Sequence, residues 1–488
     1  MNRYLKVFTD TRMLAIFFLG FSSGLPLALT GATLQAWLTD AKIDIGTVGL
    51  FALVGLPYTM KFLWAPFMDS YRLPMFGALG LRRGWAVATQ VGLIAAIAGL
   101  SFVDPSSQLE LFSLMALVVA FFSASQDIVV DAYRTEIIQK ESYGAGAGVY
   151  ATGYRVAMTF ISGGVALVMA DYMSWNFVYL FMAALNSVGL VTILVSKEPS
   201  IARKAKSLSF KDTVVSPFLE LFQRSGAMEI LIFVMIYKLS TLMATALLTK
   251  FLLDIGYTKT MIGSVNKVAG FVGLLLGTIA GGSLMVKFGL KRSLWIFGIG
   301  QSFVGLTLCG LMYVAGMDAG YREAGLVLII GLDNFVMGLG TVALMSFMMT
   351  FCNQQFTGTQ LALFSSLTAV TRVVLVAHAG FIIDKIGYMT FFILTVPLAI
   401  PGLLLLRRFD HWQTTSTNLH AKFQKGDLIL VLIFMASLIG LASDPLWRWA
   451  ELKEVGTVVV EVSAFGVIAV ILAGLLKPYL GFGKKRAA

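Results

Sequence analysis

The stretch Met13-Leu-Ala-Ile-Phe-Phe-Leu-Gly-Phe-Ser-Ser-Gly-Leu-Pro-Leu-Ala-Leu-Thr-Gly-Ala-Thr-Leu-Gln-Ala-Trp37 contains no charged side chain. A helix of about 20 apolar residues is long enough to cross the hydrocarbon core of a bilayer. Similar runs recur along the 488 residues, which are 58% hydrophobic and 13% charged with a mean hydropathy of +0.83. The sequence therefore predicts an all-α membrane protein. The runs are too long for an outer-membrane barrel, whose strands need only about ten residues.

Fourteen apolar windows are long enough to span a membrane. They fall near residues 13–37, 47–68, 84–103, 111–134, 145–170, 174–196, 227–252, 260–286, 293–315, 325–351, 359–383, 388–406, 427–443 and 455–476. Of the 37 Lys and Arg residues, 25 lie on the side of the N-terminus, 7 on the other side and 5 within windows, when Arg134 and Lys250 at window ends are counted with the adjoining loops. Because basic loops stay in the cytoplasm, we expect both termini to be cytoplasmic. The basic net charge then reflects topology, and we expect no nucleic-acid partner.

The polar connection 197–226 divides the first twelve windows into two groups of six. We expect an N-terminal six-helix bundle over 1–196, a cytoplasmic linker over 197–226, a C-terminal six-helix bundle over 227–407, and a linker with an extra two-helix hairpin over 408–488. We expect this hairpin to lie outside the transport pathway. Within the first linker, apolar residues recur at near-helical spacing beside bases. This pattern is typical of a helix on the anionic membrane surface, although a solvated linker fits as well.

The two groups of six echo each other. Arg155 in the fifth window is followed eight residues later by Gly163, and Arg372 in the eleventh is followed at the same spacing by Gly380. Six-span repeats in one orientation are the parallel arrangement of secondary transporters, whose substrate site lies near the midplane between the repeats. The sequence therefore favours a transporter.

Other membrane functions lack a supporting motif. A channel is disfavoured because no filter-like ring motif is present. A membrane enzyme acting on lipid-linked sugars is disfavoured because the sequence has no paired-carboxylate, Ser/His or metal constellation. Cys309 and Cys352 have no CxxC spacing and no His or Cys companions, so we expect no metal and no cofactor.

Nine charged residues inside the windows are candidates for burial at membrane depth. They are Lys61, Asp127, Asp131, Arg155, Lys238, Lys267, Asp333, Arg372 and Glu461. A charge at the centre of a spanning helix costs roughly 2.5 to 3.5 kcal/mol, so such a residue is paired, hydrated or functional.

Asp127, Asp131 and Arg134 follow the spacing i, i+4 and i+7, which places them within one stripe of about 60° on a helix. Two carboxylates one turn apart favour proton binding by one of them. We therefore expect Asp127 and Asp131 to couple transport to protons. The alternative for Asp131 and Arg134 is a salt bridge at a cytoplasmic gate.

Bases in the fifth, seventh, eighth and eleventh windows can face one cavity between the repeats. The candidates for binding an anionic substrate are Lys61, Arg155, Lys238, Lys267 and Arg372. Interhelix ion pairs, such as Lys267 with Asp333, are the alternative. Rings and amides suited to sugars are Trp37, Tyr154, Gln35, Gln126 and Asn266.

The stretch Gly282 to Lys291, Gly-Ser-Leu-Met-Val-Lys-Phe-Gly-Leu-Lys, resembles the cytoplasmic loop motif of the major facilitator superfamily, with Val286 in place of the usual acid. The corresponding loop after the second window supplies Asp69, Arg82 and Arg83, which we expect to have structural or gating roles together with Arg134 and Asp333.

A larger set of short motifs resembles the AmpG muropeptide permeases of Gram-negative bacteria from about Leu14 to Pro401. These motifs are Ser23–Thr30, Lys61–Pro66, Arg82–Trp85, Ser123–Val129 with Asp131-Ala132, Gly144–Ala147, Gly153–Arg155, Tyr237–Leu239 and Val265–Lys267. The resemblance implies the fold of the major facilitator superfamily, an inner-membrane location, and proton-driven import of N-acetylglucosaminyl-1,6-anhydro-N-acetylmuramyl peptides from periplasm to cytoplasm. The implied partners are this substrate, protons and membrane lipids, and the oligomeric state stays open. A carrier for another bulky anion, such as acetyl-coenzyme A, is the alternative.

Overall fold

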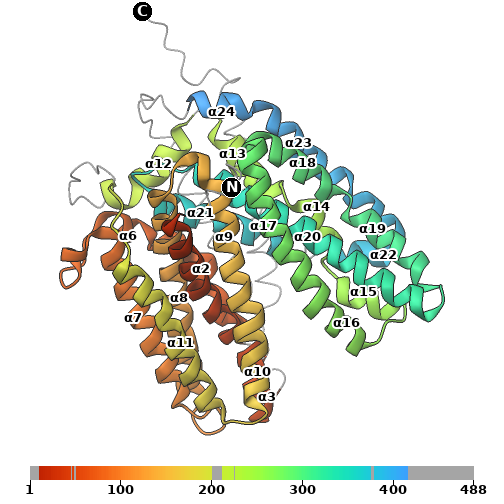
Figure 1. Ribbon diagram of the computed structural model, residues 1–488, viewed down its shortest axis with the longest axis horizontal. Coiled ribbons are helices and arrows are strands. Elements are labelled where there is room, and N and C mark those ends of the chain that lie inside the picture. Colours follow the sequence, from red (N-terminus) through yellow and green to blue (C-terminus); the bar gives the residue numbers. More distant parts are fainter. Residues whose placement is uncertain are drawn as a thin grey trace, which may run out of the picture.

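A computed structural model of the chain describes residues 10–44, 47–48, 51–200, 211–224, 226–374 and 379–415. All regular elements in these ranges are helices. They form two groups that approach each other at one end and diverge toward the opposite end (Figure 1). We call the end at which α2 (Thr11–Leu29) begins, near residues 197–224, the linker end. The opposite end is called the far end.

The N-terminal half is built from long helices and one broken segment. Its longer elements are α2, α3 (Ala32–Asp40), α7 (Leu81–Ser101), α8 (Leu109–Ile137), α9 (Tyr143–Arg155), the π-helix η6 (Val156–Val165), α10 (Ala166–Ala170) and α11 (Trp175–Val195). Its short elements are η2 (Phe51–Gly55), α5 (Leu56–Met60), η3 (Lys61–Leu63), α6 (Ala65–Ser70), η4 (Gly77–Leu79) and η5 (Lys140–Ser142).

The linker and the C-terminal half continue the helical pattern. Their elements are the π-helix η7 (Lys211–Val215), α12 (Ser216–Gln223), α13 (Ala227–Ile236), α14 (Leu239–Ala244), α15 (Leu248–Asp254), α16 (Lys259–Val265), the π-helix η8 (Asn266–Gly270), α17 (Phe271–Phe288), α18 (Leu290–Ser302), α19 (Val304–Ala315), α20 (Ala319–Phe351), α21 (Thr357–Val374), α22 (Ala379–Thr395), η10 (Pro397–Ala399), α23 (Ile400–Leu405), η11 (Leu406–Arg408) and α24 (Phe409–Thr415).

Nine helices in the described ranges are long and apolar enough to cross a membrane, and a pair bent by 49° brings the number to ten. The second window is not one helix but the short pieces η2, α5, η3 and α6, because Pro57 and Pro66 each remove a backbone donor. The boundary between the eleventh and twelfth windows falls inside α22, at Gly387, whose φ of 74° requires glycine. The windows near 427–443 and 455–476, with Glu461, lie outside the described residues, so the count of fourteen and the hairpin stay predictions.

Two sets of contacts join the halves. In one, α9 packs along α17, and in the other α21 packs against α5, η3, α6 and α8. These are contacts of the fifth with the eighth window and of the eleventh with the second. Exchange of the two six-window repeats converts the first set into the second, as expected for a pseudo-twofold axis.

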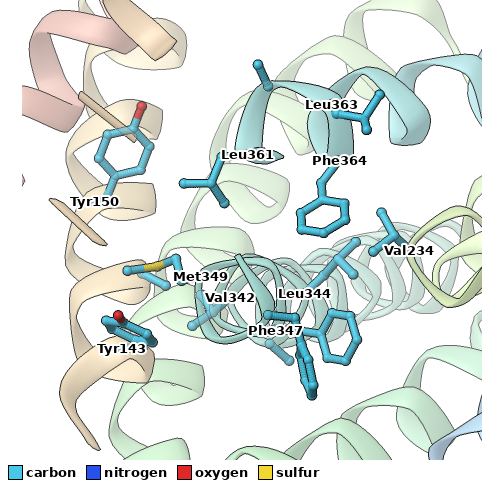
Figure 2. Close-up of a cluster of buried hydrophobic side chains, with 14 of the residues drawn as sticks. Tyr143, Tyr150, Val234, Val342, Leu344, Phe347, Met349, Leu361, Leu363 and Phe364 are labelled. Carbon is cyan, nitrogen blue, oxygen red and sulfur yellow. The ribbon is translucent and has the colours of Figure 1, made fainter. Parts of the chain in front are cut away.

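The contact between α9 and α17 depends on glycine. A Cβ atom on Gly148 would lie 2.8 Å from the carbonyl oxygen of Thr278, closer than real Cβ contacts allow. Small residues of this kind let helix backbones approach closely inside a membrane. At the linker end the seam is filled by apolar side chains: Tyr143 and Tyr150 of α9 border a cluster that includes Phe347 of α20 and Leu361 of α21 (Figure 2).

The linker helix packs on protein. Phe218 and Leu221 of α12 are buried, and α12 contacts α13 and α21. Arg224, which forms an ion pair with Glu220, donates a hydrogen bond of 2.6 Å to the carbonyl oxygen of Phe351. Neither a helix whose apolar face lies on lipid nor a solvated linker therefore describes residues 216–223, because α13 and α21 contact α12 and its apolar side chains are buried. Residues 201–210 lie outside the described residues.

Trp412 is buried in the C-terminal half, at the linker end. Its side chain is fully buried, its ring centroid lies 5.8 Å from that of Phe233, and its indole N–H donates a hydrogen bond of 2.7 Å to Glu229. The folded unit therefore extends beyond the end of the twelfth window, to at least this residue.

Truncation tests this boundary. A chain ending after Thr415 is expected to keep the melting temperature of the full chain in detergent. A chain ending after Asp410 loses Trp412, and removal of a buried Trp costs about 3 to 5 kcal/mol. The point variant Trp412→Ala, measured in parallel by thermal denaturation, should reproduce this loss. Equal melting temperatures for all three variants and the parent would contradict the boundary.

Candidate functional site

The predicted stripe on α8 faces a base from the broken second window. The Lys61 Nζ lies 3.8 Å from Asp127 Oδ2, and both side chains are buried. Pro57 and Pro66 interrupt the helix on either side of Lys61, which leaves this base on the short segment η3. The structure therefore brings together two of the predicted site residues as a buried ion pair.

The part of the stripe nearer the linker end forms a second ion pair. Arg134 lies 2.9 Å from Asp131, and its guanidinium lies 4.2 Å from the centre of the Tyr150 ring. The salt bridge anticipated as the alternative for Asp131 and Arg134 is thus present. The ring of Tyr154, one turn further along α9, lies 6.0 Å from that of Tyr150, so α9 lines the stripe with two aromatic residues.

Two predicted bases adjoin π-helices. Arg155 is the last residue of α9, immediately before η6, and Lys267 lies in η8 beside Asn266. π-Helices are rare and occur frequently at functional sites because the extra residue redirects neighbouring side chains. No pattern in the sequence predicts these π-helices. Arg155 is half-buried, whereas Lys267 is exposed.

The remaining charges of the C-terminal half have other neighbours. Lys238 Nζ donates a hydrogen bond of 2.8 Å to Thr341. Asp333 accepts one of 2.6 Å from Thr307. The ion pair of Lys267 with Asp333, given above as an alternative, is not present among the described residues. Arg372 lies on α21, and its side chain lies outside the described residues.

Three further candidates lie apart from the ion pair. Gln126 points into the N-terminal half, where its amide donates to Ser22, which also contacts Gln90 and Asn186. Trp37 is buried in a cluster of rings from Phe112, Trp175 and Tyr179. Gln35 is exposed on α3 at the far end. A direct role in substrate binding for these residues stays a prediction. The network around Gln126 could have been predicted only from the polar residues Ser22, Gln90 and Asn186, which lie in three other apolar windows.

The linker end is closed by Asp69. Its carboxylate accepts hydrogen bonds from the backbone N–H groups of Gly358 and Thr359, at 3.1 and 2.7 Å, and from the Thr359 hydroxyl at 2.6 Å. These donors form the first turn of α21 in the opposite half, where the helix dipole favours an anion. Asp69 therefore connects the two halves through a buried, charge-assisted cap.

Arg82 holds this cap in place. Its guanidinium lies 2.7 Å from Asp69 and 2.6 Å from Glu136, and all three side chains are fully buried. Arg83 instead donates to the carbonyl oxygens of Ile193 and Leu194. Asp69 and Arg82 thus belong to one buried ionic cluster, and their structural or gating roles stay predictions. Glu136 was missed because its partners come from other helices.

The loop before α18, which corresponds to the loop before α7, has the same positive-φ glycine but lacks the capping carboxylate. Gly80 and Gly289 both have positive φ, 103° and 77°, immediately before α7 and α18. Val286 replaces the acid that corresponds to Asp69, and at this edge Gly144 of α9 meets the side chain of Met285. Only one of the two seams between the halves therefore carries a buried carboxylate at this position.

Comparisons with known proteins agree with this architecture. A model of the Major Facilitator Superfamily matches residues 16–376. The anhydromuropeptide permease of Escherichia coli (strain K12) is 41% identical over 407 residues, which cover 83% of this chain and 81% of that protein. The chain belongs to the AmpG-type permeases of the major facilitator superfamily. A putative transporter AmpG 4 of Rickettsia felis is 30% identical to this AmpG-type permease and is covered over 97% of its length.

Solved structures share the fold of this AmpG-type permease. The proton:xylose symporter XylE has a TM-score of 0.59 at 11% identity, with 85% of this chain and 98% of that chain covered. The human organic anion transporter MFSD10 has a TM-score of 0.57 at 16% identity, with 83% and 100% covered. The family assigns a multi-pass membrane transporter rather than an enzyme, and the described residues contain no group of three or more His, Cys, Asp or Glu that could hold a metal.

Replacement of Asp69 tests the cap. Asp69→Asn keeps the shape but removes the charge that faces α21. Each charge-assisted hydrogen bond contributes about 1.5 to 3 kcal/mol, so loss of one should raise the population open at the linker end roughly ten- to hundredfold. The half-buried Cys352 lies near Asp69 and Glu136. Opening of the linker end should therefore increase the rate at which a maleimide labels Cys352.

The buried Cys309 of α19 serves as the internal control for global unfolding. Its labelling rate should not change. If Asp69→Asn leaves the labelling rate of Cys352 at the parent value, the cap does not hold the linker end closed.

Proposed function

We propose that this permease imports anhydro-muropeptides, the products of peptidoglycan turnover, from periplasm to cytoplasm, driven by protons. The name of the Escherichia coli relative, 41% identical over most of the chain, supports the substrate class. In this proposal the protein lies in the bacterial inner membrane with both termini in the cytoplasm, as the excess of bases on the side of the N-terminus suggests. The linker end is then cytoplasmic and the far end periplasmic.

The buried pair of Lys61 and Asp127 is the observation that carries the proposal. An unpaired charge at membrane depth costs roughly 2.5 to 3.5 kcal/mol, so Lys61 separates from Asp127 only when another anion replaces it. A carboxylate of the peptide is such an anion. When Asp127 binds a proton, its attraction for Lys61 falls and the substrate carboxylate takes its place. Proton binding and substrate binding are thereby coupled through one lysine.

The closed linker end supports access of substrate from the far end in this conformation. The Asp69 cap and the apolar cluster of Figure 2 close the seam toward the cytoplasm, whereas the two halves diverge toward the far end. We infer that the conformation described receives substrate from the periplasm. Release to the cytoplasm requires the cap on α21 to break.

Further bases suit an anionic peptide. Arg155 at the π-helix η6 and Lys267 at η8 belong to opposite halves, and the rings of Phe160 and Phe271, which follow them, stack with centroids 6.4 Å apart. The two bases therefore lie near the same stretch of the seam. In the proposal Arg155, Lys267, Lys238 and Arg372 hold carboxylates, while Tyr154 and Asn266 contact sugar. Asp131 contributes to the field at Asp127 through its pair with Arg134.

Asp127→Asn tests the coupling. The variant keeps hydrogen-bonding capacity but does not titrate, so proteoliposomes with an imposed pH gradient should no longer accumulate radiolabelled anhydro-muropeptide. Exchange of substrate at equal pH should persist, because exchange needs no net proton movement. Accumulation at the parent level by Asp127→Asn would refute the assignment.

The matched control is Asp104→Asn in the loop between α7 and α8. Hydrogen bonds from the hydroxyl and backbone N–H of Ser106 hold the pKa of Asp104 below its usual value. Asp104 therefore stays ionised throughout an assay between pH 5 and pH 8, and its replacement should leave accumulation unchanged.

Arg155→Lys tests the anion site. Lysine keeps the charge but loses the planar fork that binds a carboxylate through two hydrogen bonds. Loss of one charge-assisted contact should weaken muropeptide binding roughly ten- to hundredfold. The control Arg12→Lys changes an exposed arginine at the linker end. Equal affinity of Arg155→Lys and the parent, measured by calorimetry, would remove Arg155 from the site, and competition by acetyl-coenzyme A instead of muropeptide would favour the alternative substrate.

A further inference from the structure

Several buried polar atoms around Asp127 have no hydrogen-bond partner among the described residues. They are Ser23 Oγ, Tyr58 OH, Ser123 Oγ and Asp127 Oδ1. Buried polar groups in proteins nearly always form hydrogen bonds, to protein or to water. Ser23 lies beside Asp127, and Tyr58 lies beside Ser123. These groups from α2, α5 and α8 therefore form a small polar region inside the N-terminal half.

These groups follow one another from Asp127 toward the far end. Ser123 precedes Asp127 by one turn of α8, on the same face. The Tyr58 hydroxyl lies beside the hydroxyls of Ser123 and Thr30 and within electrostatic reach of Asp127. Thr30 ends α2, about 10 Å beyond Ser23 at 1.5 Å per residue. Because α2 runs toward the far end and α8 runs away from it, all three hydroxyls lie on the far side of Asp127.

Thr30 is the member of this row that lies furthest toward the far end. Thr30 is buried, the adjoining Gly31 is half-buried, and Ala32 and Gln35 of α3 are exposed. On the linker side, the row ends at the pairs of Lys61 with Asp127 and of Arg134 with Asp131. Hydroxyl groups thus extend from the buried carboxylate toward the far end, whereas charged groups lie on the other side of Asp127.

We propose that Thr30, Tyr58 and Ser123 form a proton relay that connects the far end to Asp127. The relay rests on the proposed function, because it supplies the proton that couples transport at Asp127. The Thr30 hydroxyl, which donates a hydrogen bond of 3.1 Å to the carbonyl oxygen of Pro26, breaks this bond and turns toward Tyr58 to pass on a proton. Each hydroxyl accepts a proton on a lone pair and releases its own to the next group, directly or through one intervening water. After one passage every hydroxyl has its original composition, and the Asp127 carboxylate has become a carboxylic acid.

The charges around Asp127 agree with this direction. The groups that face it are Lys61 from η3, Ser23 from α2, Asp131 and Arg134 from α8, and Tyr154 from α9. The two bases repel a proton that approaches from the linker end. A path through neutral hydroxyls on the far side has no such barrier. The relay therefore delivers protons from the side from which the substrate enters.

The test compares two rates in proteoliposomes for Tyr58→Phe, Ser123→Ala and the double variant. One rate is the uptake of radiolabelled anhydro-muropeptide driven by a pH gradient, and the other is exchange at equal pH. Removal of a relay hydroxyl should slow driven uptake at least about tenfold, while exchange changes less than about twofold. Ser125→Ala is the matched control, because Ser125 is also buried on α8 but accepts a hydrogen bond from the Trp64 indole N–H.

The outcomes separate the relay from the proposed function. If Asp127→Asn abolishes driven uptake but Tyr58→Phe and Ser123→Ala both keep the parent ratio of driven uptake to exchange, the relay is overturned and proton coupling at Asp127 stands. If the parent itself shows no driven uptake of muropeptide, or Asp127→Asn retains it, the proposed function fails first. A reduced ratio in both hydroxyl variants, with Ser125→Ala at the parent ratio, supports the relay.

Discussion

The carboxylate of Asp69 occupies the first turn of a helix that belongs to the other half of the molecule. Such an anion is stable in the interior only if several donors surround it, and here two backbone N–H groups, one hydroxyl and one guanidinium do so. The position of α21 depends on this contact. Because α21 also packs on α8 and on η3, the contact determines what covers Lys61 and Asp127 from the linker end.

Relations within one helix could be predicted from the sequence, and relations between helices could not. The spacing of Asp127, Asp131 and Arg134 correctly placed them on one face of α8, and their depth followed from the hydropathy. The partner of Asp127 could not be predicted, because Lys61 comes from a window that its prolines break into short pieces. Gln126 adjoins Asp127 in sequence, yet rotation by 100° per residue directs it into the interior of the N-terminal half.

The same distinction explains the linker. Apolar residues beside bases predict an amphipathic helix, and residues 216–223 do form α12. The pattern does not reveal whether lipid or protein covers the apolar face, because both are apolar and both tolerate bases at the edge. Only the partners of Glu220 and Arg224 on α20 and α21 decide the matter, and these lie far away in sequence. The π-helices beside Arg155 and Lys267 escaped prediction for a related reason, since single inserted residues leave no periodic signal.

The absence of an acid at Val286 makes the two edges of the interface mechanically different. Along one edge, α21 is fastened by an ion to a helix terminus, a contact that breaks abruptly once the atoms separate. Along the other, glycines of α9 and α17 form a smooth surface on which the backbones can roll while staying in contact. The first edge behaves as a clasp and the second as a hinge. When the linker end opens, the halves should therefore swing about the line between α9 and α17, and the gap should widen first beside α21.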